Sequence, residues 1–256
     1  MARFFSLENQ VAVVTGGTSG IGLKTAERFI AAGANVLISG RKDGTEIAAK
    51  IGAKFAQVDV SNEDSMQSLM ETAKETWGNI DVLVNNAGAN FGYNVLMETD
   101  ISDFDKNFNI NTKGVVYGIK HAVPRMNPGG RIVNVSSAAG LQGVAYLAPY
   151  VASKWAVIGI TRTAAVELGD KGIRVNVICP TSVNTPMANT PEGQPQLRME
   201  HKAVPLARIA EPEEIAAMIH FLSSTDCNFI NGQAIAVDGG FTAGMSITAY
   251  NTLAAE

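Results

Sequence analysis

The chain has 256 residues, 46% of them hydrophobic, and a formal net charge of −4 at pH 7, which fits one large globular domain. The charge is too small and too evenly spread for a nucleic-acid surface, and no apolar run could cross a bilayer, so neither partner is predicted. The N-terminal residues lack the apolar stretch and cleavage site of a secretion signal. Cys179 and Cys227 form no metal-spaced pair. We therefore expect a reduced cytoplasmic protein without a metal site.

Strand-length apolar runs alternate with helical patterns along the whole chain. Several runs are continuous in Val, Ile and Leu, as buried parallel strands are. The predicted strands are Val11–Thr15, Asn35–Ser39, Lys54–Val58, Val82–Asn85, Arg131–Val135, Arg174–Cys179 and Gln233–Val237. The predicted helices are Gly20–Ala32, Asn62–Trp77, Ser102–Met126, Tyr150–Leu168 and Pro212–Leu222. This alternation predicts an α/β fold, a doubly wound parallel sheet of about seven strands with helices on both faces, in one domain over residues 1–256.

Two local patterns refine this outline. Ser61, with Asp64 three residues later, predicts a capped start for the second helix. The segment 185–205 holds four prolines and has no clear periodicity, and such a long connection is usually a functional lid or a disordered stretch. We predict a mobile substrate lid with a short helix around Gln196–His201. An ordered surface loop is the alternative.

A glycine-rich turn follows the first predicted strand. Gly16 permits a tight turn, Gly20 allows the main chain to approach a pyrophosphate, and Gly22 lets helix and strand pack closely. The start of the following helix offers amide hydrogens and a positive dipole to an anion. The alternative is an ordinary strand–helix turn, but its place at the first such junction favours cofactor binding. The same turn contributes Thr18, Ser19 and Ile21 to the predicted site.

The residues for proton chemistry lie in the middle of the chain. Tyr150 and Lys154 are four residues apart on a predicted helix, so they share one face. A nearby ammonium group lowers the pKa of a phenol from about 10, which lets the phenol exchange a proton with an alcohol or carbonyl oxygen near neutral pH. Ser137 precedes this pair, and Asn111 lies further back in a polar break of a helix. We expect proton transfer and a hydride carrier to share one cleft.

Together these motifs resemble the short-chain dehydrogenase/reductase family. The turn is spaced Thr-Gly-x-x-x-Gly-x-Gly rather than Gly-x-Gly-x-x-Gly, and this departure is typical of the family. The resemblance covers nearly the whole chain and implies a Rossmann-type single domain, a nicotinamide cofactor and a homotetramer. The motifs that carry it are Thr15-Gly16-x-x-x-Gly20-x-Gly22, Asn85-Asn86-Ala87-Gly88, Asn111, Ser137, Tyr150-x-x-x-Lys154, Asn231-Gly232-Gln233 and Val237-Asp238-Gly239-Gly240.

By resemblance, further residues would contact the cofactor. Asp59, followed by Val60, would accept a hydrogen bond from the adenine amino group; alternatively Asp59 is a carboxylate at a turn. Asn86, Ala87 and Gly88 would line the adenosine and ribose side, and the asparagines would also support the sheet. Pro180, Val183 and Thr185 would hold the nicotinamide carboxamide, although Thr181 stands where the family more often has glycine.

The resemblance also assigns the reaction. Tyr150 would be the general acid/base, and Lys154 would lower its pKa and bond the nicotinamide ribose. Ser137 rather than Ser136 would hold the substrate oxygen, because the family's serine stands thirteen residues before the tyrosine. Asn111 would anchor a water that passes protons from Lys154 to solvent, interrupting its helix. Each of these residues alone could instead serve packing or helix capping. Because their roles interlock as a set, we expect a catalytic function. We expect Tyr146 and Met187 to line the substrate pocket.

The end of the second strand bears on the choice between NADP and NAD. Gly40 stands where an acidic residue would bond the ribose hydroxyls of NAD, and Arg41 follows it. Arginine suits a phosphate dianion geometrically, so we predict NADP(H). Alternatively Arg41 is a solvated loop residue and Asp43 folds back to the ribose, which would favour NAD(H).

The predicted function is interconversion of a secondary alcohol and a ketone, as in a short-chain alcohol dehydrogenase or carbonyl reductase. A catalytically silent dinucleotide-binding sensor or scaffold is the main alternative, and an enoyl reductase or sugar-nucleotide epimerase is weaker. The expected walls, 89–96, 138–149 and 187–208, hold few fixed charges besides lid residues. They favour a neutral, moderately apolar substrate such as an alicyclic, steroid-like or terpenoid compound. The charged lid residues are Arg198, Glu200, Lys202 and Arg208.

Overall fold

The fold is built on a seven-stranded sheet with the strand order β3-β2-β1-β4-β5-β6-β7. Every strand pairs in parallel with its neighbours. A computed structural model describes residues 4–191 and 193–255. The strands are β1 (Val11–Thr15), β2 (Asn35–Gly40), β3 (Lys54–Gln57), β4 (Ile80–Asn85), β5 (Met126–Val135), β6 (Arg174–Pro180) and β7 (Ala234–Val237). The doubly wound parallel sheet predicted from the sequence is confirmed.

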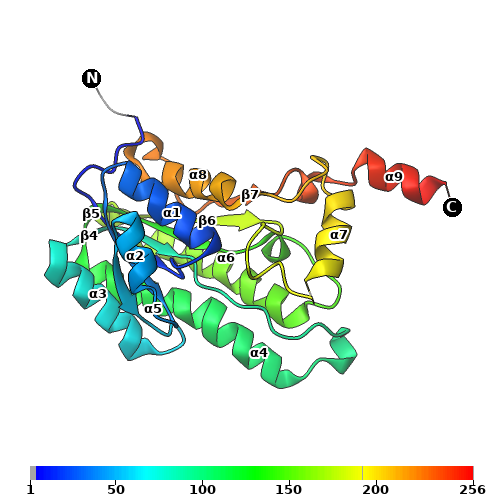
Figure 1. Cartoon of the computed structure of the whole chain (residues 1–256), viewed down its shortest axis with the longest axis horizontal. Helices are drawn as coiled ribbons and strands as arrows, with labels where there is room; N and C mark the ends of the chain where they lie inside the picture. Colours follow the sequence, from blue (N-terminus) through cyan, green and yellow to red (C-terminus); the bar gives the residue numbers. More distant parts are fainter. Residues whose placement is uncertain (1–3, 192, 256) are drawn as a thin grey trace.

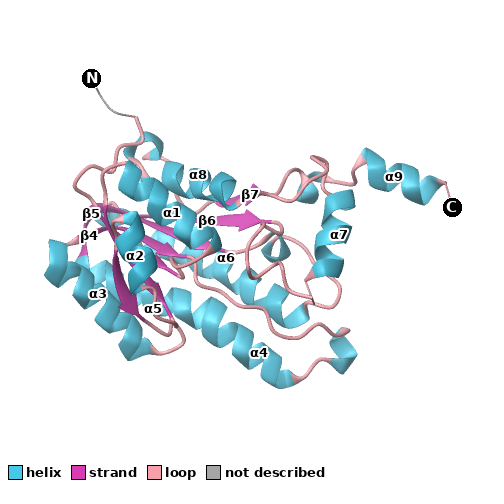
Figure 2. Cartoon of the chain, viewed as in Figure 1, coloured by secondary structure: helices cyan, strands magenta, loops and turns pink. Residues whose placement is uncertain are grey.

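Helices cover both faces of this sheet (Figures 1 and 2). On one face α1 (Gly20–Ala31), α2 (Thr45–Ile51) and α8 (Pro212–Ser223) pack against strand side chains such as Val14 and Ile38. On the other face α3 (Glu63–Trp77), α5 (Gly114–Ala122) and α6 (Ala148–Leu168) cover side chains such as Val13 and Leu83. Successive strand residues point to opposite faces, so strands buried on both sides need continuous apolar runs.

The predicted helix over residues 102–126 is divided in the structure. It comprises α4 (Ile101–Asn107), a π-helical turn (Phe108–Lys113), α5 and a short 3₁₀ turn (Val123–Arg125). The π turn contains Asn111, so the polar break marks a change of helical geometry. π-helical turns inside α-helices occur often at functional sites.

Three further details differ from the sequence prediction. The helices α2 and α9 (Ile247–Ala254) were not predicted, and the lid helix α7 spans Gln194–Ala203. The predicted Ser61 cap is wrong: Asn62 is the N-cap of α3, and its Oδ1 accepts a hydrogen bond from Ser65 N at 2.8 Å. Ser61 instead donates its hydroxyl to Asp59 Oδ1 at 2.7 Å, because the helix begins one residue later than predicted.

The strand order reverses between β1 and β4, and ligands of such sheets bind beyond the carboxyl ends of the strands near this point. The helix α7 lies beyond the end of β6, and α9 projects from the body on the same side (Figure 1). Of the helices in the described part of the chain, none combines the length and apolar character of a membrane span.

Candidate active site

One cleft runs along the carboxyl ends of the strands and brings most of the predicted site residues together. The residues outside its lining are Gly22, Asn111 and Tyr146. Tyr146 is 59% exposed in a turn with a φ of +69°, so its side chain does not wall the cleft as expected. The predicted residues in the lining are Gly16, Thr18, Ser19, Gly20, Ile21, Arg41, Asp59, Val60, Asn86, Ala87, Gly88, Ser137, Tyr150, Lys154, Pro180, Val183, Thr185 and Met187.

The turn after β1 is packed main chain against main chain. Gly16 has a φ of +64°, and a Cβ added at Gly22 would lie 2.3 Å from Gly16 O. Asn86 Nδ2 clamps the turn from β4 by donating to Thr15 O at 2.9 Å and Gly16 O at 3.2 Å. Gly22 therefore serves helix–strand packing, and the asparagine supports the sheet as the resemblance implied.

The start of α1 is suited to an anion. Its N-cap, Ser19, makes no side-chain capping hydrogen bond, and its first turn contains no acidic residue. The first amide hydrogens of a helix have no partner within the helix, and together with the helix dipole they bind phosphate groups. This turn therefore fits the pyrophosphate of a dinucleotide. Thr185 of the lid also reaches it, since a Cβ added at Gly20 would lie 2.9 Å from Thr185 Cγ2.

Two acidic residues follow the carboxyl ends of β2 and β3, and both already accept hydrogen bonds within the protein. Asp43 Oδ1 accepts hydrogen bonds from Thr45 N at 2.9 Å and Thr45 Oγ1 at 2.6 Å, and Asp43 does not line the cleft. Asp59 Oδ1 accepts from Ser61 N at 2.9 Å and from its hydroxyl. These hydrogen bonds, with a smaller effect of Arg41, hold the pKa of Asp59 below its usual value. Arg41 is exposed and lines the cleft, close enough to Asp59 to affect its pKa.

The reaction centre lies at the start of α6. Lys154 is 4% exposed; its Nζ lies 5.5 Å from the centroid of the Tyr150 ring and donates to Val135 O at 3.0 Å. Burial lowers the pKa of Lys154 to about 8. Burial also raises the pKa of Tyr150 to about 12, against a smaller lowering by its hydrogen bond to Ser137. The expectation that Lys154 lowers the pKa of Tyr150 is wrong: burial of the phenol raises this pKa, and Ser137 is the neighbour that lowers it.

The two adjacent serines have different surroundings. Ser136 is 3% exposed and donates its hydroxyl to Lys154 O at 2.8 Å, which fixes α6 against the end of β5. Ser137 lines the cleft, and its hydroxyl is hydrogen-bonded to the Tyr150 phenol. Ser137 Oγ also accepts from Ala139 N at 3.1 Å, which orients the side chain. Both serines line the cleft, but the Ser136 hydroxyl is engaged with Lys154 O, so Ser137 is the serine placed to meet a substrate oxygen beside the phenol.

Asn111 supports the site from behind the cleft wall. Its Nδ2 donates to Ala89 O at 2.9 Å and Ser153 Oγ at 3.0 Å, while its Oδ1 accepts from Ala89 N at 2.9 Å. A Cβ added at Gly88 would lie 3.2 Å from Asn111 Oδ1 and 3.4 Å from Lys154 Nζ. The side chain thus ties the segment after β4 to the reaction centre.

Helix α7 contributes side chains to the cleft, within the wall predicted at 187–208. Gln196 and Glu200 of α7 both line the cleft, and Glu200 is only 3% exposed, whereas Arg198 and Lys202 on the same helix are exposed. The four-residue spacing of Gln196 and Glu200 indicates that they share a face of a helix. It does not reveal whether that face points inward. Asn90, Tyr93, Val144 and Leu147 also line the cleft, within the walls predicted at 89–96 and 138–149, whereas Phe241 was not predicted there.

Within residues 4–191 and 193–255, His, Cys, Asp and Glu side chains nowhere gather in a group of three or more that could hold a metal ion. The chemistry of the cleft is thus that of a phenol, a lysine, a serine and an anion-binding turn. These groups suit proton transfer at an oxygen beside a dinucleotide.

Comparison with known proteins points the same way. A family model described as Enoyl-(Acyl carrier protein) reductase matches residues 16–242. The chain is 40% identical to the meso-2,3-butanediol dehydrogenase of Serratia marcescens, over 92% of this chain and 96% of that protein. It is 38% identical to the trans-4-hydroxycyclohexanecarboxylate dehydrogenase of Sinomonas cyclohexanicum, over 93% and 95%. A blue fluorescent protein from a metagenomic library, solved with NADPH, superposes with a TM-score of 0.85 at 32% identity, over 92% and 99%.

Proposed function

Since the chain belongs to the short-chain dehydrogenase/reductase family, and is an oxidoreductase that interconverts secondary alcohols and ketones with a nicotinamide cofactor, we propose that Tyr150 is its general acid/base. The observation that carries this proposal is the placement of the Tyr150 phenol, hydrogen-bonded to Ser137 and next to Lys154, in the cleft that begins at the phosphate turn. The alternative of a silent sensor has no support, because all four polar residues of the reaction centre are present.

In the proposed mechanism, the bound nicotinamide supplies or accepts the hydride. Ser137 donates a hydrogen bond to the substrate oxygen and holds it at the phenol. Tyr150 gives that oxygen its proton during reduction and removes it during oxidation. Lys154, with its pKa lowered to about 8, is able to exchange a proton near neutral pH and restore the phenol. Both amide hydrogens of Asn111 are engaged, so any water it anchors would be held by its main-chain carbonyl in the π turn.

We further propose that the cofactor is NADP(H). The turn after β1 fits a pyrophosphate, and the place after β2 offers Arg41 rather than a free carboxylate. Asp43 is the residue whose binding to the ribose would favour NAD(H), but its Oδ1 already accepts hydrogen bonds from Thr45 at the start of α2. The structural relative in complex with NADPH supports the same choice. Asp59, Asn86–Gly88 and Val183 line the route from the adenine end to the reaction centre.

We also propose a cytoplasmic homotetramer, on the strength of the family and of exposed apolar helix faces. On α6, Trp155 is 52% and Val166 is 83% exposed, and on α9, Ile247 is 80% and Leu253 is 60% exposed. Single exposed apolar residues are common, but several of them on one helix suit contacts between copies. Both cysteines are free, which suits a reducing compartment.

The substitution Tyr150→Phe tests the proposed function. We expect turnover of any ketone to fall by about 10²–10⁴-fold, because the proton donor is lost, while NADPH affinity stays near that of the wild type. Tyr250→Phe on the exposed helix α9 is the control and should leave both quantities unchanged. Turnover by Tyr150→Phe close to the wild-type rate would rule out the assignment.

Enoyl reduction is the second candidate, because the description of the matched family model names it. The four-residue spacing of Tyr150 and Lys154 favours alcohol chemistry, as enoyl reductases have a wider spacing. Assays with crotonyl coenzyme A beside a panel of ketones distinguish the two reactions: turnover of the thioester alone would replace the proposed function.

A further inference from the structure

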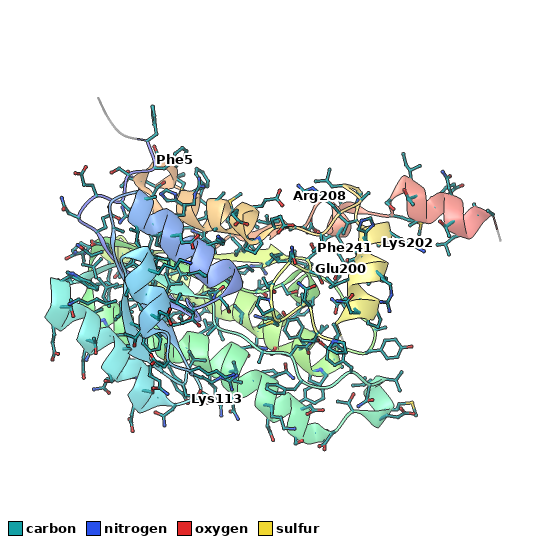
Figure 3. All side chains as sticks on the ribbon, viewed as in Figure 1. Phe5, Lys113, Glu200, Lys202, Arg208 and Phe241 are labelled. Carbon is teal, nitrogen blue, oxygen red and sulfur yellow. The ribbon has the colours of Figure 1, made fainter. Side chains whose placement is uncertain are left out.

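Glu200 is a buried carboxylate at the substrate end of the cleft that the proposed mechanism does not use. It is 3% exposed, lines the cleft, and lies on the side of α7 toward the body of the molecule, near Phe241, whereas Lys202 lies on the opposite side toward α9 (Figure 3). A carboxylate removed from water is costly unless hydrogen bonds or a cation compensate it. Its partners therefore indicate what else it is able to bind.

The hydrogen-bond donors that stabilise the buried Glu200 carboxylate are uncharged groups. Oε2 accepts a hydrogen bond from Ser182 N at 2.8 Å, and Oε1 accepts one from Gln196 Nε2 at 2.8 Å. Within the described part of the chain, no Lys, Arg or His forms an ion pair with it. An ionised carboxylate has about four acceptor positions, so acceptor capacity and a full negative charge remain for whatever enters the cleft.

The charge acts on the reaction centre. The negative charge of Glu200 contributes to the raised pKa of Tyr150, after burial and together with Tyr93. A second acceptor lies at the same end: Asn90 Oδ1 is buried without a hydrogen-bond partner in the described structure, while Asn90 Nδ2 donates to Tyr93 Oη at 2.9 Å. Glu200 and Asn90 both line the cleft, so two side chains with oxygen acceptors lie at this end.

We propose that Glu200 selects the substrate, accepting a hydrogen bond from a hydroxyl or ammonium group remote from the reacting carbonyl and rejecting substrates that carry a carboxylate or phosphate there. This inference rests on the proposed function and narrows its substrate class to neutral or cationic compounds with a second polar hydrogen. A like charge brought into a desolvated pocket is repelled strongly, and a buried acceptor left without a donor also costs affinity.

Three ketones of one carbon frame test the inference. 4-Methylcyclohexanone, 4-(hydroxymethyl)cyclohexanone and 4-oxocyclohexanecarboxylate differ only in the group remote from the carbonyl. For the wild type we expect kcat/KM with the hydroxymethyl compound to exceed that with the carboxylate by at least about tenfold, the size of one hydrogen bond to a charged group. Equal or reversed values would overturn the inference.

Two variants separate charge from shape. Glu200→Gln keeps the size and an acceptor oxygen but removes the charge, so the carboxylate should gain about tenfold relative to the methyl compound. Glu200→Asp keeps the charge but shortens the reach to Ser182 and Gln196, so all rates should fall while the carboxylate stays disfavoured. Glu75→Gln, on the exposed surface of α3, makes the same change in net charge and should leave the ratios unchanged.

The failures are distinguishable. If Glu200→Gln lowers kcat/KM for all three ketones equally, Glu200 merely braces α7 against the 181–184 segment, and the selection role is wrong. If Glu200→Gln changes NADPH affinity and leaves the ketone ratios unchanged, the carboxylate acts on the cofactor, and the inference is again wrong. If no ketone or alcohol of a broad panel is converted by the wild type, the proposed function fails, and with it this inference.

Discussion

The two ends of the cleft are built on opposite principles. The cofactor end is made of main chain and small residues in close contact, with Gly22 against Gly16 and the Asn86 amide hydrogen-bonded to the turn after β1. The reaction end is made of ionisable side chains held out of water, with Lys154 and Glu200 at 4% and 3% exposure. We therefore expect added atoms to disrupt the cofactor end. The reaction end lowers the stability of the fold, because charged groups removed from water are unfavourable.

The largest effect is expected from one added methyl group at the cofactor end. In Gly22→Ala the new Cβ would lie 2.3 Å from Gly16 O and 2.5 Å from Asn86 Nδ2. Neither neighbour is able to move without breaking the turn, so we expect a loss of about 3 kcal/mol in the free energy of unfolding, with NADPH binding lost. Thermal unfolding and cofactor titration measure the two effects.

A matched glycine tests whether position rather than residue type decides this outcome. Gly169 at the end of α6 has no atom within 4 Å of an added Cβ and a φ of −63°. Gly169→Ala should therefore keep or raise stability, by up to about 1 kcal/mol. If both variants unfold at the wild-type temperature, the cofactor end is not packed as tightly as the distances indicate.

The next largest effect concerns how the cofactor end distinguishes NADPH from NADH. Arg41→Ala should weaken NADPH binding by about 10–100-fold, the size of a hydrogen bond to a charged group, and leave NADH binding nearly unchanged. Lys42 follows Arg41 and does not line the cleft, so Lys42→Ala should change neither affinity appreciably. Equal losses for the two cofactors in Arg41→Ala would assign Arg41 to the adenosine rather than to the 2′-phosphate.

The smallest effect has the opposite sign and concerns the reaction end. Burial lowers the pKa of Lys154 from 10.5 to about 8, which corresponds to a penalty of about 3 kcal/mol. The hydrogen bond to Val135 O offsets part of it. Lys154→Met should therefore stabilise the protein by about 1–2 kcal/mol at pH 7 while abolishing turnover.

The pH dependence identifies the cause of this gain. The unfolded lysine binds its proton more tightly than the buried one, so the penalty is complete below the folded pKa of about 8. It shrinks as the pH rises toward 10.5 and then disappears. Chemical denaturation at pH 7 and pH 10 should show a larger gain for Lys154→Met at pH 7. Lys171→Met, at an exposed site, should show no such difference.

The sequence predicted the sheet well for physical reasons that are local. β1 is bounded by polar residues and glycine around a continuous apolar run, and its observed range equals the predicted one. The seven residues of α2 follow the turn formers Asp43 and Gly44, so no helical period is visible there. In residues 102–126 the apolar period continues through the π turn, so the division of the helix does not appear in the pattern.

The site was predictable to the extent that it depends on spacing. The phosphate turn and the Tyr150–Lys154 pair are short-range motifs, and the fold gathers them into one cleft. The direction of the pKa shift of Tyr150 was not predictable, because it depends on how much of the fold covers the phenol. The inward orientation of Glu200 depends likewise on how α7 sits on the body, since its acceptor contact is with Ser182, eighteen residues earlier.

The contact between Thr185 and Gly20 has a mechanical consequence. Thr185 begins the segment that carries α7, and its methyl group lies within van der Waals reach of the turn that follows β1. A shift of that segment away from the sheet would therefore withdraw the Thr185 methyl group from the turn that follows β1. The segment that carries α7 is therefore in steric contact with the turn that is suited to an anion, so the two are not positioned independently.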